Sequence, residues 1–100
     1  MSGSSIAVAA VSPFPLDAAR WAAVVEHLKL GPQQVRIAEM VILGRGDKEI
    51  AVALGIAKPT LRGYLVRLYQ RVKVENRLQL VVRLLCVAVE LEAARVRHHA

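Results

Sequence analysis

Two short stretches of helical periodicity, joined by a glycine turn, constrain this chain more than any other feature of its sequence. In residues 48–54, Ile50, Ala51 and Leu54 share one helical face, and Gly55 follows where a helix would end in the left-handed backbone region. The second stretch begins near Pro59, which falls in the first helical turn, where a missing N–H costs little. Its apolar side chains repeat at helical spacing, at Leu61, Leu65, Leu68 and Val72. The pattern predicts a helix-turn-helix.

Basic residues are concentrated in the second of these helices and just beyond it. Residues 58–77 hold six basic residues and one acidic residue, so this segment carries +5 of the chain's net charge of +6. A charge run on a helix is commonly just a solvated face. Here it coincides with a helix-turn-helix, and a basic helix in that setting is typical of a phosphate-binding surface. The sequence therefore predicts binding to double-stranded DNA.

A dense, collinear set of residues runs without a gap through residues 30–84. Its members are Leu30, Gly44, Lys48, Glu49, Ile50, Ala51, Leu54, Gly55, Ile56, Thr60, Arg62, Leu65, Arg67, Tyr69, Val74, Asn76 and Arg77. In this order and spacing the segment resembles the LuxR-type (GerE-like) DNA-binding domain. The resemblance implies a bacterial transcriptional regulator with a four-helix domain. It also implies that the helix beginning near Lys58 is the recognition helix and that the last helix makes a homodimer contact.

The candidate DNA-binding residues lie mostly on the second helix of the helix-turn-helix. They are Lys48, Lys58, Pro59, Thr60, Arg62, Gly63, Val66, Arg67, Gln70, Arg71, Lys73 and Arg77. Arg62, Val66 and Gln70 could contact G, T and A in the major groove, although such a base-reading face is sparse. Two interpretations stay open: a sequence-dependent DNA-binding regulator, or a small adaptor whose helix-turn-helix binds RNA polymerase or another regulator. Gly63 is either a tolerated glycine or a point of close backbone approach.

Three expected helix starts lack the hydroxyl side chain that the family usually has there. Gly31, Gly46 and Ala57 occupy these positions, and each missing cap costs about 1 kcal/mol where nothing replaces it. Asp47 is a candidate to replace one of them.

The composition favours an all-α fold in one small domain. Only four aromatic residues are present, and no stretch alternates as a strand would. We expect a flexible N-terminal arm over residues 1–15, an additional helix over residues 16–29 and the LuxR-type domain over residues 30–97. Asp17 can cap the additional helix, and Trp21 is expected in the core. The segment before the domain is too short for a separate sensory fold, so we expect regulation by abundance or by a partner.

The C-terminal segment has more apolar surface than one small core can cover. Residues 78–91 read LQLVVRLLCVAVEL, and their polar side chains form a single narrow stripe. The second apolar face predicts an isologous dimer. Its residues are Leu78, Val82, Leu85, Cys86 and Val89. The alternative is that the helix around Trp21 covers this face within one chain.

No constellation of residues supports catalysis. The three histidines, His27, His98 and His99, have no metal-site spacing, and Cys86 is expected to be a packed thiol. We therefore predict no catalytic residue, no metal and no cofactor. No segment resembles a membrane span or a signal peptide, which predicts no membrane partner and a cytoplasmic, nucleoid-associated protein.

Overall fold

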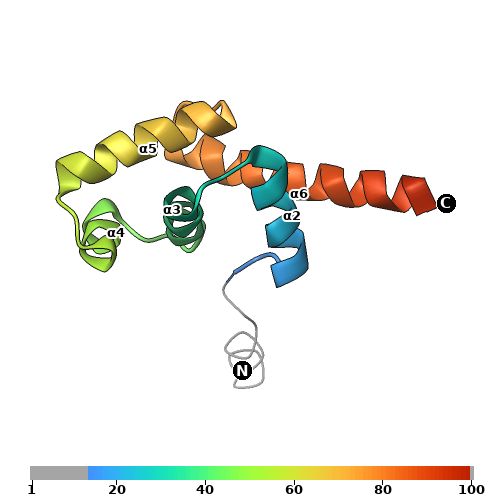
Figure 1. Cartoon of the computed structure of the whole chain (residues 1–100), viewed down its shortest axis with the longest axis horizontal. Coiled ribbons are helices and arrows are strands. Elements are labelled where there is room, and N and C mark those ends of the chain that lie inside the picture. Colours follow the sequence, from blue (N-terminus) through green and yellow to red (C-terminus); the bar gives the residue numbers. More distant parts are fainter. Residues whose placement is uncertain (1–13, 100) are drawn as a thin grey trace, which may run out of the picture.

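The computed structural model describes residues 14–99, with side chains described for residues 14–97. This part of the chain consists of helices and contains no strand (Figure 1). The helices are α2 (Ala18–Leu28), α3 (Pro32–Ile42), α4 (Asp47–Leu54), α5 (Lys58–Val72) and α6 (Arg77–His99). The predicted all-α fold, a four-helix helix-turn-helix domain with an added N-terminal helix, is confirmed. Most of the predicted N-terminal arm, residues 1–13, lies outside the described residues.

The helices α2 and α6 begin at side-chain caps. Asp17 precedes α2, and its Oδ1 accepts a hydrogen bond from the Arg20 backbone N–H at 2.8 Å, as predicted. Asn76 precedes α6, and its Oδ1 accepts one from the Gln79 N–H at 2.9 Å. Both caps satisfy N–H groups that have no partner within their own helix.

The helices that start at glycines are capped in another way. Gln34 Oε1 accepts a hydrogen bond from the Gly31 N–H at 3.1 Å, and Glu49 Oε1 accepts one from the Gly46 N–H at 3.0 Å. These contacts are the half of a capping box that the third helical residue supplies. The prediction that Asp47 would replace a cap is wrong: Asp47 already lies in the first turn of α4, and its carboxylate binds Arg77.

The turn between α4 and α5 depends on Gly55. Its φ of 67° lies in the left-handed region, where a Cβ is unfavourable, as the sequence predicted. The Ile56 N–H donates to the Ala51 carbonyl oxygen at 3.0 Å and closes the turn. Pro59 falls in the first turn of α5, also as predicted. These local features set the position of α5 relative to α4.

The apolar stripe of α5 is the centre of the core. Leu61, Leu65, Leu68 and Val72 are all buried. They belong to one cluster with Ile37 and Val41 from α3, Ile50 from α4, and Leu80 and Leu84 from α6. The predicted inner face of α5 is therefore confirmed.

The added helix α2 packs against α6 and is tied to α3. Trp21 is buried, as predicted, and its Nε1 donates a hydrogen bond to the Glu39 carboxylate at 2.7 Å. Phe14, which falls within the predicted arm, meets the Trp21 ring edge-on with the ring centroids 5.3 Å apart. Trp21 thus buries its apolar ring, and its N–H group has a hydrogen-bond partner.

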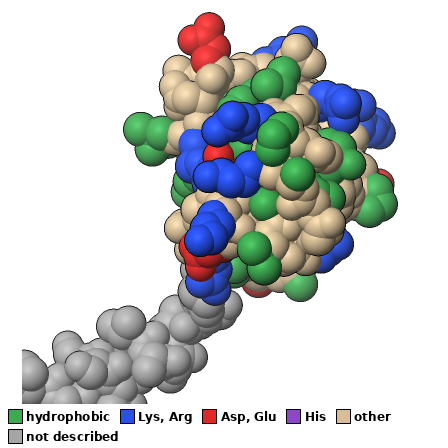
Figure 2. All heavy atoms as spheres, turned by 90° about the vertical axis from the view of Figure 1, so that its left-hand side faces the viewer, with side chains coloured by type: hydrophobic (Ala, Val, Ile, Leu, Met, Phe, Trp, Pro, Cys, Tyr) green, Lys and Arg blue, Asp and Glu red, His purple; other side chains and the backbone are tan. Residues whose placement is uncertain are grey.

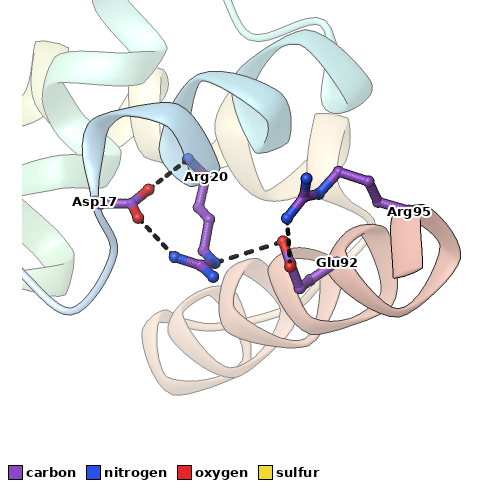
Figure 3. A network of polar contacts seen from close by, with 4 residues as sticks. All are labelled: Asp17, Arg20, Glu92 and Arg95. Atoms are coloured by element: carbon purple, nitrogen blue, oxygen red, sulfur yellow. Dashed lines mark hydrogen bonds and ion pairs between the residues drawn. The ribbon is translucent and has the colours of Figure 1, made fainter. Parts of the chain in front are cut away.

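A charged network crosses the junction between α2 and α6 (Figure 3). Arg20 lies between two carboxylates, 2.6 Å from Asp17 and 3.6 Å from Glu92, and Arg95 binds Glu92 at 2.8 Å. Hydrogen bonding to the Arg20 backbone N–H lowers the pKa of Asp17, and the hydrogen bond from Arg95 lowers the pKa of Glu92. Because both pKa values are lowered, the two carboxylates stabilise the fold at pH values above the usual carboxyl pKa range. This stabilisation is lost as the pH falls through their folded-state pKa values.

Replacing Leu65 tests the packing of α5. Leu65→Ala should lower the free energy of unfolding by about 2–5 kcal/mol, because it leaves a cavity in the core. Val66→Ala is the matched control, since the neighbouring side chain is exposed and should change this free energy by less than about 0.5 kcal/mol. Urea denaturation measures both; equal effects of the two substitutions would contradict the assigned faces.

Candidate nucleic-acid interface

Most of the predicted DNA-binding residues lie on α5. Because the apolar stripe of this helix is buried in the core, its other faces are directed to solvent. Nine of the twelve lie within α5. The exposed ones are Lys58, Pro59, Thr60, Arg62, Val66, Arg67, Gln70 and Arg71, while Gly63 is half-buried. Lys73 is the exposed C-cap residue that follows α5, and Lys48 is exposed on α4. Ten of the twelve are therefore exposed on the helix-turn-helix, Gly63 is half-buried in α5, and Arg77 lies at the start of α6.

This surface is positively charged. The α5 sequence contains four basic residues and no acidic residue. Figure 2 shows the end of the molecule where α4 and the start of α5 lie, and there Lys and Arg side chains gather with hydrophobic side chains among them. Cations gathered on the exposed faces of one helix attract the phosphates of a nucleic acid and raise its local concentration.

Arg67 lies toward α3. Its guanidinium carbon is 5.6 Å from the centre of the Tyr64 ring, a cation–π contact. The two side chains line a shallow cavity of about 230 Å³ together with Gln33, Gln34 and Ile37 from α3. The contact holds Arg67 at one edge of the exposed α5 face, where a phosphate could be bound.

Arg77 has partners within the fold. Its guanidinium forms an ion pair with Asp47 and donates a hydrogen bond to the Arg45 carbonyl oxygen at 2.8 Å. Both side chains of the pair remain about one-third exposed. The sequence predicted a DNA contact for Arg77, but its charge is offset by Asp47, thirty residues earlier in the chain. No local pattern reveals such a pair, because the two helix starts meet only in the folded chain.

Gly63 is not required by the packing of the described residues. Among them only Gly44 and Gly55 are glycines with positive φ, so Gly63 has ordinary helical backbone. A Cβ at Gly63 would meet no described atom within 4 Å apart from its own helix and neighbours. A glycine inside a helix costs about 1 kcal/mol relative to alanine. The fold alone therefore gives no reason for this residue.

An apolar face remains exposed along α6. Leu78 is 72% exposed, Val82 51% and Val89 68%, whereas Leu85 is half-buried. The helix α2 packs mainly on another side of α6, next to Ala88 and Leu91. Val89, at the edge of the exposed face, lines a cavity with residues at the start of α2 but keeps most of its side chain exposed. Cys86 is exposed on this face, and the prediction of a packed thiol is therefore wrong for the single chain. A groove of about 450 Å³ runs along the same surface.

Other kinds of site have less support. Within residues 14–97, no group of three or more His, Cys, Asp or Glu side chains comes together as a metal site would require. No helix of the described chain combines the length and the apolar character that crossing a membrane demands.

One family of known proteins matches this chain. The family described as bacterial regulatory proteins, luxR family (GerE), matches residues 28–84, more than half of the chain. The chain belongs to the luxR family of bacterial regulatory proteins. Membership supports DNA binding and transcription regulation, and it confirms the resemblance found in the sequence. No curated protein and no solved structure matches the chain significantly. Most of α2 and the second half of α6 lie outside the segment matched by the luxR family.

The Asp47–Arg77 pair should stabilise the fold. We expect the double-mutant cycle of Asp47→Ala and Arg77→Ala to give a coupling free energy of about 0.5–1 kcal/mol, reduced by solvent screening of a pair this exposed. Thermal or urea denaturation of the four proteins measures it. Arg71→Ala is the control, since Arg71 is exposed on α5. Additive effects of the two substitutions would show that the pair contributes nothing.

Proposed function

We propose that this luxR-family chain is a homodimeric transcription regulator that binds double-stranded DNA with sequence preference through α5. The observation that carries the proposal is the position of the positive charge. The positive charge lies on the exposed faces of α5, and the opposite face of this helix is buried at the centre of the core. A helix held in this way presents its charged side as a rigid body, as insertion into the major groove requires.

The exposed α5 side chains fall into two groups by chemistry. Lys58, Arg67, Arg71 and Lys73, with Lys48 from α4, are suited to phosphate contacts at the two walls of the groove. Arg62 and Gln70 are the long side chains that can form paired hydrogen bonds with G and A. Phosphate contacts outnumber base contacts in this arrangement. We therefore expect affinity that falls steeply with salt and a modest preference for sequence.

A dimer would compensate for the few base contacts of one chain. The exposed apolar side chains of α6 lie at positions 78, 82, 89 and 96, a spacing that keeps them on one side of the helix. An isologous contact between two such faces would bury them and place two α5 helices about one DNA turn, roughly 34 Å, apart. A regulator of this kind acts where the chromosome lies, so we also propose a cytoplasmic, nucleoid-associated location.

The DNA-binding test uses two single variants. Arg62→Ala and Arg67→Ala should each weaken binding to an arbitrary duplex by about 1–3 kcal/mol, and Arg67→Ala, which removes a phosphate contact, should also lower the slope of log affinity against log salt by about one. Fluorescence anisotropy over a salt series measures both quantities. Arg97→Ala is the control, because Arg97 is exposed in the last turns of α6, at the opposite end of the molecule from α4 (Figure 1).

Two results would overturn this assignment. Folded Arg62→Ala and Arg67→Ala proteins that bind as tightly as the parent would exclude α5 as the DNA-contacting helix. A parent protein that binds no duplex at low salt, but associates with RNA polymerase or another regulator, would favour the adaptor function instead.

The dimer is tested by sedimentation at micromolar concentration. The parent should sediment as a dimer, and the double variant Val82→Glu, Val89→Glu should sediment as a monomer, because charges would replace buried apolar side chains. Ala94→Glu is the matched control on another exposed side of α6. A parent that sediments at the mass of one chain, 10.9 kDa, would contradict the dimer.

A further inference from the structure

A small apolar notch interrupts the basic face of α5. It consists of Gly63, which has no side chain, and Val66, which follows three residues later on the same side of the helix. Side chains in a helix lean toward its N-terminus, so the Val66 methyl groups stand beside the gap at Gly63. Arg62 is exposed in the turn that contains Gly63. The notch therefore lies beside a cation on the surface proposed to face DNA.

Neither residue of the notch has a role inside the fold. The Val66 side chain is 52% exposed, although the four core residues of the same helix are buried. At Gly63 the space for a Cβ is open, and the backbone does not need a glycine. Exposed valine also offers nothing to a phosphate, since it has neither charge nor hydrogen-bond donor. An apolar pair without hydrogen-bonding side-chain groups suits an apolar group on a base edge better than it suits a phosphate.

Resting on the proposed DNA-binding function, we propose that the Gly63–Val66 notch reads thymine by receiving its 5-methyl group in the major groove. Thymine is the one standard DNA base with a methyl group on that edge, and apolar side chains recognise it by contact. The missing side chain at Gly63 lets the base edge approach the helix backbone, and Val66 covers one side of the methyl group. The notch is thus a specificity determinant, separate from the cations that supply affinity.

Removal of the methyl group alone tests this inference. One probe is a duplex of about 21 base pairs, two turns of B-DNA, with alternating thymine and adenine. The second probe is the same duplex with deoxyuridine in place of every thymine, which changes no hydrogen-bonding group. The parent should bind the thymine duplex about fourfold more tightly for each methyl group that it buries, the factor expected for one buried methylene-sized group. Fluorescence anisotropy at one fixed salt concentration measures the ratio.

Three variants separate the notch from general DNA binding. Val66→Ser should bring the thymine-to-deoxyuridine affinity ratio close to one. Gly63→Ala should fill the gap and weaken binding to the thymine duplex, yet it should raise the melting temperature by about 4 °C or more, because alanine favours the helix. Val52→Ser is the matched control, since Val52 is a still more exposed valine, 74%, on α4, and its ratio should equal that of the parent.

The outcomes distinguish this inference from the function on which it rests. Equal binding of the two duplexes by the parent overturns the thymine-reading notch and leaves DNA binding intact. A thymine preference that persists in Val66→Ser, or unchanged binding by Gly63→Ala, also overturns it, because the preference would then arise elsewhere. Absence of binding to either duplex at low salt overturns the DNA-binding proposal together with the notch.

Discussion

Burial of the α5 stripe is the interaction on which the rest of the structure depends. Leu61, Leu65, Leu68 and Val72 meet residues from α3, α4 and α6, so one helix holds the other three in place. The same contact determines which α5 side chains reach solvent. Because Arg62, Arg67 and Arg71 alternate with buried leucines along the helix, they cannot turn inward without exposing the core. Stability and the charged surface thus arise from one packing arrangement.

The parts of the chain outside the matched luxR segment form a structure of their own. Most of α2 and the second half of α6 lie beyond that segment, and they pack against each other. Arg20 and Glu92 link them, while Trp21 and Glu39 link α2 to α3. In this arrangement α2 braces one side of the long last helix. The apolar side that includes Leu78, Val82 and Val89 stays open to solvent, which is where we propose the second copy.

Not every cation near α5 has the same role. Arg77 neutralises Asp47 and holds the starts of α4 and α6 together, and Arg67 rests on the Tyr64 ring. Arg62 and Lys58 have no described ion pair and lie on the exposed surface. The net charge of the segment therefore overstates the charge available to DNA. The segment is uniformly basic in sequence, but its cations fall into three kinds in the structure: one that holds two helix starts together, one that is stacked on an aromatic ring, and several that are exposed.

The sequence by itself determined the features that act over a few residues. The helical periodicity of residues 61–72, the left-handed turn at Gly55 and the Asp17 cap were all predicted, because each depends on backbone preferences and neighbouring side chains. Only the tertiary structure decided contacts between distant residues: the Asp47–Arg77 pair, the exposure of Cys86, the side of α6 that α2 covers and the open space at Gly63. These depend on how packed helices are oriented, and local periodicity leaves that orientation open.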